Sequence, residues 1–461
     1  MASIVGGSTA GLTIAARLTE SSNTTVLVLE AGADHTSDMN VLCTRPLPSH
    51  VRNLEYDWDC KTVPQVTRLL SLKLQVTDDN SPPRTTKSSF TSAANSSGAP
   101  ARSTSCSGRT PPDKKSMAGA SSVTRADLGT SWPRTCACRR PSSPRPSSRQ
   151  LTCFSATSTQ TPAAPELGRA VRSDPRDGKA LGGYVNLLNI DGATRSFAAN
   201  AYLGPARQRP NLKVVTGVVV TKIVSERSGG KIAATGVRWT KNGSTYEATA
   251  AREVVLAAGS IASPQLLEVS GIGGEWLLRR HGIEVFVDNP NVSEICWAMF
   301  TSRLVRFVTK PGVPTKEDYA NATYFQEHLD LYIQNKTGHL SSAGASSAFL
   351  SLKHIASTLD LDALSLGVRT GKTGLDERYR LLIRDLKSEA IAQELTMEGG
   401  ISPQFSSDTT KLFSANAQGN FVSILGVLEH PFSRVSVHIQ SLFYAVAELA
   451  ADFLKEAERT T

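Results

Sequence analysis

The chain has 461 residues, 40% of them hydrophobic, which is enough for two domains. It has no run of 18 apolar residues, so no membrane-spanning helix is predicted. Its net charge of +9 is confined to one segment: residues 67–165 hold 14 Lys and Arg against 4 Asp and Glu, and the remainder holds 36 against 37. A generally basic surface is therefore not expected, and nucleic acid is not predicted as a partner.

The seven cysteines are an odd number, and a disulfide framework is not expected in a chain of this length. Cys136 and Cys138 are too close together and too isolated to predict a zinc site, and no other metal site is expected. Met1 is followed almost at once by a glycine-rich turn, without the apolar core of a signal peptide. The expected location stays open between the cytoplasm and, if the start is truncated, the outside of the cell.

The first predicted unit is a strand, a glycine-rich turn, a helix and a second strand. The stretch SIVGGSTAG (residues 3–11) leads into a helix, and TVLVLEAG (residues 25–32) is the second strand. We expect Gly6 to allow the tight turn and Gly11 to let the helix approach the strand, although Ser8 takes the middle glycine position. Glu30 ends the second strand, where a carboxylate can bind a ribose diol. The unit therefore predicts dinucleotide binding; a purely structural turn is the alternative.

Residues 67–165 form an anomalous low-complexity segment. Ser, Thr, Pro, Arg and Ala dominate it, with almost no apolar periodicity, yet it contains four of the seven cysteines. A disordered insert of this length is unusual inside a compact protein. A reading-frame error is the preferred interpretation, and a real disordered insert is the alternative.

A second strand–helix unit is predicted at VVLAAGSIASPQLLEVSGIG, residues 254–273. The apolar VVLAAG predicts a buried parallel strand. Ser260 and Ser263 are expected to cap the following helix, with Pro264 in its first turn and Gly271 at its end.

Together these stretches resemble the glucose–methanol–choline (GMC) family of FAD oxidoreductases. Residues 259–273 are similar to the family's second signature, and VGGSTAG…VLVLEAG to its N-terminal FAD-binding segment. Residues 56–65, 194–223 and 281–294 add further likeness, and residues 325–440 add a weaker one. The resemblance covers about residues 2–66 and 170–295, and it suggests a fungal member.

The resemblance implies an α/β FAD-binding (Rossmann-like, GMC type) domain with an α+β substrate-binding domain. The implied boundaries are 1–66 and 166–294 for the FAD-binding domain, 67–165 for the anomalous segment, 295–437 for the substrate domain and 438–461 for a C-terminal FAD-domain helix. The cofactor is FAD. The implied FAD-binding residues are Gly6, Ser8, Thr9, Ala10, Gly11, Glu30, Ala31, Val220 and Ile439.

The chain departs from the family at three places. The first signature, expected within about residues 80–100, is absent, and the pattern is lost after Glu294. In residues 430–457 an alternating strand pattern ending at Ile439 runs straight into a helical pattern without a turn, which indicates a deletion or a mis-spliced join. His438 at this join matches the family's second catalytic His, or is simply a polar residue that ends the strand. The first catalytic His has no match, because His430 is expected to be structural.

By this resemblance the function is oxidation of a small-molecule alcohol to a carbonyl: a His base, here His438, takes the hydroxyl proton and a hydride passes to flavin N5. The electron acceptor is oxygen or another molecule, and fungal secondary metabolism is one setting. The alternatives are a catalytically impaired or inactive GMC-like protein, and a lyase or cyclase on the same fold. An NAD-dependent enzyme is disfavoured by residues 259–273.

Outside residues 67–165, five Asn-X-Ser/Thr tripeptides would suit a secreted protein, although such tripeptides also arise by chance. They begin at Asn23, Asn242, Asn291, Asn321 and Asn335.

Overall fold

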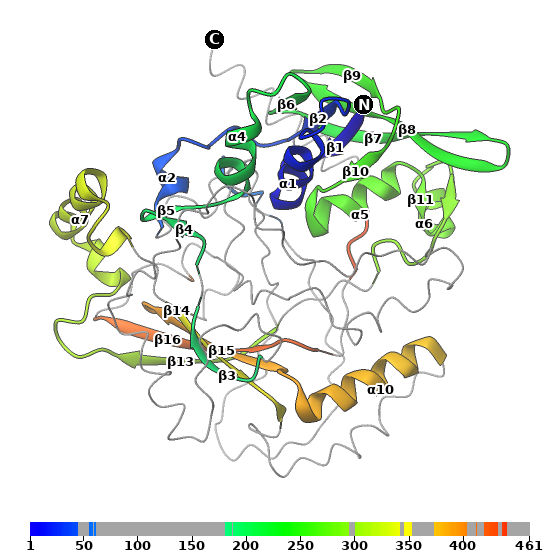
Figure 1. Ribbon diagram of the computed structural model, residues 1–461. Coiled ribbons are helices and arrows are strands. Elements are labelled where there is room, and N and C mark those ends of the chain that lie inside the picture. The colour runs from blue at the N-terminus through cyan, green and yellow to red at the C-terminus, as the bar shows by residue number, and fades with distance from the viewer. Residues whose placement is uncertain are drawn as a thin grey trace.

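The two largest sheets of the computed structural model lie apart, and Figure 1 shows the parallel one in the upper half and the five-stranded antiparallel one below it. The structure describes residues 1–44, 55–58, 60, 180–186, 188–294, 300–341, 345–352, 373–402, 412, 419–431 and 436–439. The anomalous segment and the predicted C-terminal helix after Ile439 lie outside these residues. No helix of the described part is both long and apolar enough to cross a bilayer.

The parallel sheet has four strands in the order β10-β1-β2-β6. The strands are β10 (Val254–Leu256), β1 (Ala2–Val5), β2 (Val26–Leu29) and β6 (Leu212–Val215). In the register of β1 with β2, Ala2 stands opposite Val26 and Val5 opposite Leu29. β1 and β2 are buried on both faces, which explains their near-continuous apolar sequences. The predicted strand–turn–helix–strand unit and the predicted strand at β10 are confirmed.

Alternate residues of these strands face two different cores. Ile4, Val26 and Val28 pack against α1 (Thr9–Leu18), the π-helix η5 (Ala199–Leu203) and α4 (Gly204–Ala206). Val5, Leu27 and Leu29 pack on the other face against α5 (Gly259–Val269) and a three-stranded antiparallel sheet. That sheet comprises β7 (Val219–Ser228), β8 (Lys231–Lys241) and β9 (Ser244–Thr249).

The second large sheet has five antiparallel strands in the order β13-β16-β15-β14-β3. They are β13 (Phe300–Val308), β16 (Phe421–Leu428), β15 (Ala392–Glu398), β14 (Ala345–Leu350) and β3 (Gly182–Val185). The chain between β13 and β15 also forms helices α7 (Ala322–Asn335) and α10 (Thr373–Ser388) and the 3-10 helices η6 (Lys316–Ala320) and η7 (His339–Ser341). The range predicted to continue the FAD-binding domain thus gives strand β3 to this sheet, and the domain boundaries remain predictions.

Shorter elements complete the described part. They are α2 (Met39–Leu42), the hairpin of β4 (Ile190–Asp191) with β5 (Thr194–Arg195), the parallel pair β11 (Ile272–Gly273) and β12 (Val287–Asp288), and α6 (Glu275–Arg280).

A buried tyrosine joins α7 to the hairpin of β4 and β5. Tyr332 is fully buried, and its hydroxyl donates to the carbonyl of Ala193 at 3.0 Å, in the turn between β4 and β5. Shortly after α7, the Leu340 carbonyl accepts a hydrogen bond from the Thr44 hydroxyl at 2.7 Å. Burial raises the pKa of Tyr332, so the hydroxyl stays a donor. Residues more than 130 positions apart are thereby fixed to one another.

Two local predictions were wrong. α5 begins at Gly259 directly after β10, with Ala258 at its N-cap and no side-chain cap, so Ser260 does not cap it and Pro264 lies inside the helix. The predicted end is correct, because Gly271 adopts a positive φ of 85° just beyond it. Residues 436–439, expected to be part of a strand, are irregular, and β16 ends at Leu428. The junction with the predicted helix lies outside the described residues.

We expect Tyr332→Phe to lower the free energy of unfolding by roughly 1–2 kcal/mol, because buried carbonyls lose their donor. Urea denaturation followed by circular dichroism measures this change. Tyr246→Phe is the matched control, since Tyr246 is 48% exposed on β9 and should change the free energy by less than about 0.5 kcal/mol. Equal small effects of the two substitutions would show that the Tyr332 hydroxyl does not stabilise this junction.

Candidate functional site

The candidate site lies at the carboxyl ends of β1, β2 and β10. The chain leaves β1 through Gly6, which has a positive φ of 102° and whose N–H donates to the Leu29 carbonyl at 2.8 Å. A Cβ on Gly6 would lie 2.4 Å from the Ala257 carbonyl oxygen, at the end of β10. Glycine is therefore required here for two independent reasons, backbone conformation and space.

The helix α1 starts immediately after this turn and lies very close to it. A Cβ on Gly11 would lie only 1.9 Å from the Gly6 carbonyl oxygen, so only glycine permits this approach. Ser8 is the N-cap: its hydroxyl accepts from the Gly11 N–H at 3.4 Å and donates to the Ala257 carbonyl at 2.8 Å. Ser8, Thr9 and Ala10 are exposed, so the positive end of the helix dipole faces outward.

Glu30 stands beside this turn at the end of β2. One carboxylate oxygen accepts from the Gly7 N–H at 2.6 Å and the other from the Gly32 N–H at 2.7 Å. Burial raises the pKa of Glu30, and the hydrogen bonds from Gly32 and Gly7 oppose this shift only in part. The carboxylate is thus held by backbone donors at the same edge as the start of α1.

The start of β7 reaches the same edge. The Val218 N–H donates to the Glu30 carbonyl at 3.0 Å, and the Gly217 N–H donates to the Gly32 carbonyl at 3.2 Å. Two residues later Val220 stands opposite Trp239 of β8 and is partly buried against the core beneath the sheet. The structure therefore brings the predicted residues from Gly6 to Gly11, Glu30 with Ala31, and the segment leading to Val220 to one edge of the sheet.

His438 and Ile439 lie elsewhere, at the carboxyl end of α5. His438 Nδ1 is 2.7 Å from one oxygen of Glu268, and its Nε2 is 3.1 Å from Glu294. The Ile439 N–H donates to the other Glu268 oxygen at 2.9 Å. Glu268 is the tenth residue of α5, so it lies roughly 14 Å along the helix axis from the residue that starts α5.

The two carboxylates determine the charge state of His438. Burial by itself would lower the pKa of His438, but the hydrogen bonds and charges of Glu268 and Glu294 outweigh burial and raise it. Glu268 has no exposed surface, so its charge needs the imidazolium and the Ile439 N–H as partners. Within the described residues, both ring nitrogens of His438 are therefore directed at carboxylates.

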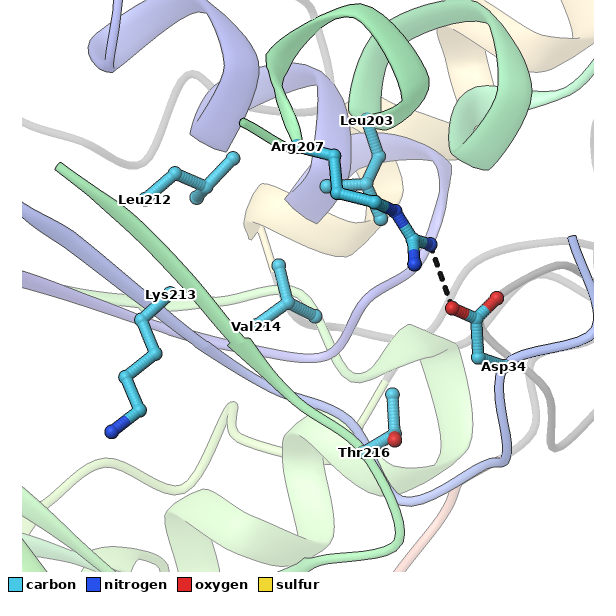
Figure 2. Close-up of a pocket in the computed structure, with 7 residues that line it drawn as sticks. All are labelled: Asp34, Leu203, Arg207, Leu212, Lys213, Val214 and Thr216. Atoms are coloured by element: carbon cyan, nitrogen blue, oxygen red, sulfur yellow. Dashed lines mark hydrogen bonds and ion pairs between the residues drawn. The ribbon is translucent and has the colours of Figure 1, made fainter. Parts of the chain in front are cut away.

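A pocket of about 430 Å³ lies along the outer strand β6 (Figure 2). Its polar feature is the ion pair of Arg207, from the turn after α4, with Asp34, at 2.6 Å. Burial raises the pKa of Asp34, but the hydrogen bonds from Arg207 and Thr36 together with the Arg207 charge outweigh it, so the net shift is downward. Lys213 and Thr216 also line this pocket. Because Asp34 already neutralises Arg207, the pair fits a structural link better than an anion site.

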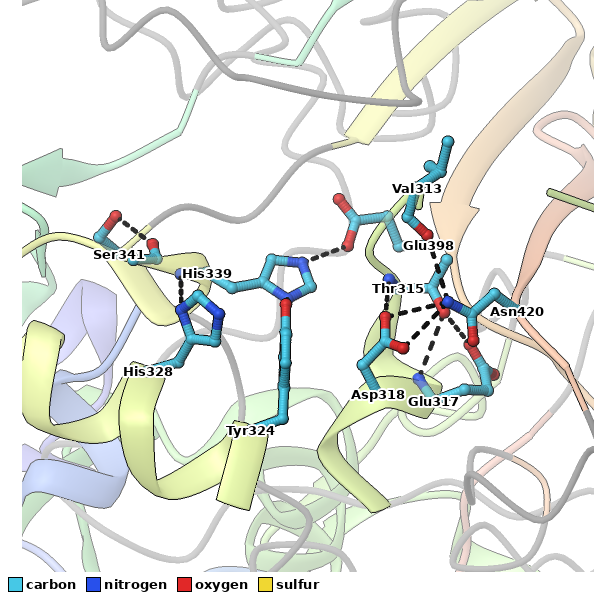
Figure 3. A network of polar contacts seen from close by, with 11 residues as sticks. Val313, Thr315, Glu317, Asp318, Tyr324, His328, His339, Ser341, Glu398 and Asn420 are labelled. Carbon is cyan, nitrogen blue, oxygen red and sulfur yellow. Dashed lines mark hydrogen bonds and ion pairs between the residues drawn. The ribbon is translucent and has the colours of Figure 1, made fainter. Parts of the chain in front are cut away.

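A second polar cluster joins α7 and η7 to the antiparallel sheet (Figure 3). His339 Nε2 is 3.2 Å from Glu398 at the end of β15, and both side chains are more than 90% buried. The other ring nitrogen is 3.2 Å from the Tyr324 hydroxyl. The His339 backbone N–H donates to His328 Nδ1 at 3.0 Å, so that nitrogen carries no proton. Burial, and then the nearby His339, lower the pKa of His328.

The same cluster continues through η6. Buried Glu317 accepts the Thr315 hydroxyl and the Gly400 N–H, each at 2.6 Å, while Asn420 donates to Asp318 at 3.0 Å. These contacts connect η6 to both ends of the β15–β16 turn region, and they satisfy each buried carboxylate that they include.

The contacts of Glu268 and Glu294 and the cluster around His339 were not predicted from the sequence. Glu268 gave one usable signal, because it stands between Leu267 and Val269 in a helix that packs on an apolar core. A glutamate that is buried on such a face almost always has a partner, because Glu is almost never fully buried unpaired. Its partner 170 residues away had no local signal.

The comparisons with known proteins agree with this fold. The family model described as GMC oxidoreductase matches residues 154–281. The GMC oxidoreductase family protein Mala s 12 of Malassezia sympodialis is 31% identical over 323 residues, covering 63% of this chain and 50% of the relative. Dehydrogenase mpl7 of Monascus purpureus is 29% identical over 385 residues, covering 78% and 59%. The chain thus spans about half the length of these relatives.

Solved structures show the same architecture. An FAD-dependent oxidoreductase from Chaetomium thermophilum aligns with a TM-score of 0.67 at 22% identity, over 95% of this chain and 76% of that one. A fungal aryl-alcohol oxidase aligns with a TM-score of 0.68 at 18% identity, over 94% and 76%. These likenesses confirm the predicted fold class, an α/β domain of the type found in FAD oxidoreductases with a second, α+β part. The family model and the Malassezia relative are both described as GMC oxidoreductase, so the predicted resemblance to this FAD-dependent family is confirmed.

Proposed function

We propose that the chain binds FAD at the carboxyl edge of the parallel sheet and oxidises a small-molecule alcohol to a carbonyl. One observation carries the proposal: the open start of α1 and the Glu30 carboxylate lie side by side at the edge formed by β1, β2 and β10. This is the pair of groups that a dinucleotide requires, donors for its pyrophosphate and an acceptor for its ribose.

The residues present fit the adenylate half of FAD. The backbone N–H groups of Thr9 and Ala10 have no hydrogen-bond partner among the described residues, and they point out of an exposed helix start. Ser8 does not crowd this place, because its hydroxyl is turned to the Ala257 carbonyl. Glu30 would hold the ribose, with Ala31 and Val220 on the adenine side. When bound, FAD supplies the acceptor for the two electrons that leave the alcohol.

The substrate class is proposed from the relatives. One solved neighbour is described as a fungal aryl-alcohol oxidase, and two Monascus relatives are described as dehydrogenases. A small alcohol is consistent with both descriptions, and a setting in fungal secondary metabolism is part of the same proposal.

The geometry of His438 favours a second candidate, a family member with impaired catalysis. A general base needs a free nitrogen within hydrogen-bond reach of the substrate hydroxyl. His438 directs both nitrogens at Glu268 and Glu294, at the end of α5 away from the start of that helix. This supports the interpretation of His438 as a polar residue that fastens the chain, and not as the base. The proposal of FAD binding does not depend on it.

We expect the full chain to retain FAD through gel filtration, with the visible absorption of a bound flavin. Glu30→Gln should raise the Kd for FAD about tenfold, because a charge-assisted hydrogen bond to the ribose is lost. Glu226→Gln, on the exposed part of β7, is the control and should leave the Kd unchanged. A folded wild-type protein that retains no flavin would contradict the proposal, and so would an unaltered Kd for Glu30→Gln.

The contribution of the His438 ion pairs to the free energy of unfolding should depend on pH. Its folded pKa is raised, so the ion pairs contribute fully below its unfolded pKa of about 6.5 and are lost as pH rises through the folded value. We expect His438→Gln to lower the free energy of unfolding most near pH 6 and to have a smaller effect at pH 9. Urea denaturation across this pH range measures the difference.

His281→Gln is the control for this series. His281 caps the end of α6, and no side-chain hydrogen bond of it is found among the described residues. The change in the free energy of unfolding caused by His281→Gln should not be larger near pH 6 than at pH 9. If His438 is instead the base, His438→Gln would abolish reduction of bound flavin by alcohols and leave stability equally affected at every pH.

A further inference from the structure

Five Asn-X-Ser/Thr tripeptides lie among the described residues, and they occupy similar positions on the fold. Asn23 lies in the turn between α1 and β2, Asn242 in the turn between β8 and β9, Asn321 at the N-cap of α7 and Asn335 at its last residue (Figure 1). Asn291 follows β12. All five asparagines are exposed. The described asparagines outside such tripeptides are mostly half-buried, which separates the two groups.

Asparagines outside the tripeptides use their amide nitrogen to hold the fold. Asn211 donates to the carbonyls of Thr19, Ser21 and Thr24 at 3.2, 2.9 and 2.9 Å. Asn200 and Asn420 likewise donate from Nδ2 to backbone carbonyls, at 2.8 and 3.2 Å. A sugar attached to Nδ2 would replace one of these N–H donors and place a bulky group in a packed site.

Among the described residues, the amide nitrogens of four tripeptide asparagines donate no hydrogen bond. Asn321 is used only through Oδ1, which accepts from the N–H groups of Thr323 and Tyr324 at 3.0 and 3.3 Å. Attachment at Nδ2 leaves that oxygen, and therefore the helix cap, in place. For Asn23, Asn242 and Asn335, the described part of the chain offers no side-chain hydrogen bond.

The hydroxyl that completes each tripeptide is also accessible at these four places. Thr25, Ser244, Thr323 and Thr337 are exposed. Asn291 differs, because its completing Ser293 is only 9% exposed and Asn291 Nδ2 contacts Asn289 at 3.4 Å. The backbone carbonyl of Ser293 also accepts from Val437, close to His438.

We propose that Asn23, Asn242, Asn321 and Asn335 are acceptor sites for N-linked glycans. In this reaction Nδ2 forms a bond to the anomeric carbon of an oligosaccharide carried on a lipid diphosphate. The bond from that carbon to the diphosphate breaks, the lipid diphosphate leaves, and Nδ2 gives up one proton. The fold keeps every contact that it makes through these four residues.

The test places the full chain behind a cleavable secretion leader in yeast. Removal of the leader reports entry into the secretory compartment, and an endoglycosidase that removes N-glycans reports attachment by a shift in gel mobility. Each single Asn→Gln substitution at the four sites should remove one glycan, and peptide mass spectrometry should locate the sugars at the same residues. A chain whose leader is cleaved but whose four asparagines remain unmodified would overturn the proposal.

A new tripeptide at a structural asparagine is the matched comparison. Lys213 is exposed, and Lys213→Thr turns residues 211–213 into an Asn-X-Thr tripeptide at Asn211, whose amide holds three carbonyls. We expect the fraction glycosylated at Asn211 to be destabilised in thermal denaturation, with Lys213→Ala as control. The glycosylated wild type and the Asn→Gln variants at the four sites should unfold at similar temperatures. Clear destabilisation by those four substitutions would contradict the proposal, since it would show that these amides hold the fold.

Discussion

The approach of α1 to the end of β1 is the constraint on which the candidate site depends. It brings the backbone at position 11 so close to the Gly6 carbonyl that no side chain is tolerated. Because the helix starts so near the strand, its free N–H groups face the same edge as the carboxylate at the end of β2. β10 closes the turn from the other side through the Ala257 carbonyl. Three separate parts of the chain therefore have to pair correctly before the edge exists.

A buried carboxylate has a comparable effect at the far end of α5. Glu268 is fully enclosed, and an enclosed charge is tolerated only with partners that balance it. Those partners, the His438 ring and the Ile439 N–H, come from the last described segment of the chain. α5 therefore does more than pack on the parallel sheet. Through Glu268 it also holds the segment that follows the antiparallel sheet.

The parts that sequence predicted well are those whose signals are local. The first βαβ unit follows from apolar periodicity and from glycines at a turn, and Glu30 follows from its position at a strand end. The predicted start of α5 was wrong because it relied on Ser260 and Ser263 as capping residues. The helix begins shortly after β10, at Gly259, without a side-chain cap. The pairing of β3 with β14 and the contact of His438 with Glu268 join residues more than 150 positions apart. Neither has a periodicity that marks it.

The order of strands in the parallel sheet has a consequence for the gene. β2 and β6 are neighbours, yet Leu29 and Leu212 are separated by the whole of the low-complexity segment. The entropy of closing such a loop rises only logarithmically, by about 0.6 kcal/mol for each doubling of its length. Both strands and their turns are encoded outside that stretch. A change of reading frame that begins and ends between them would therefore alter about a hundred codons while leaving both strands of the edge proposed to bind FAD unchanged. A gene with such a change would still encode this part of the fold.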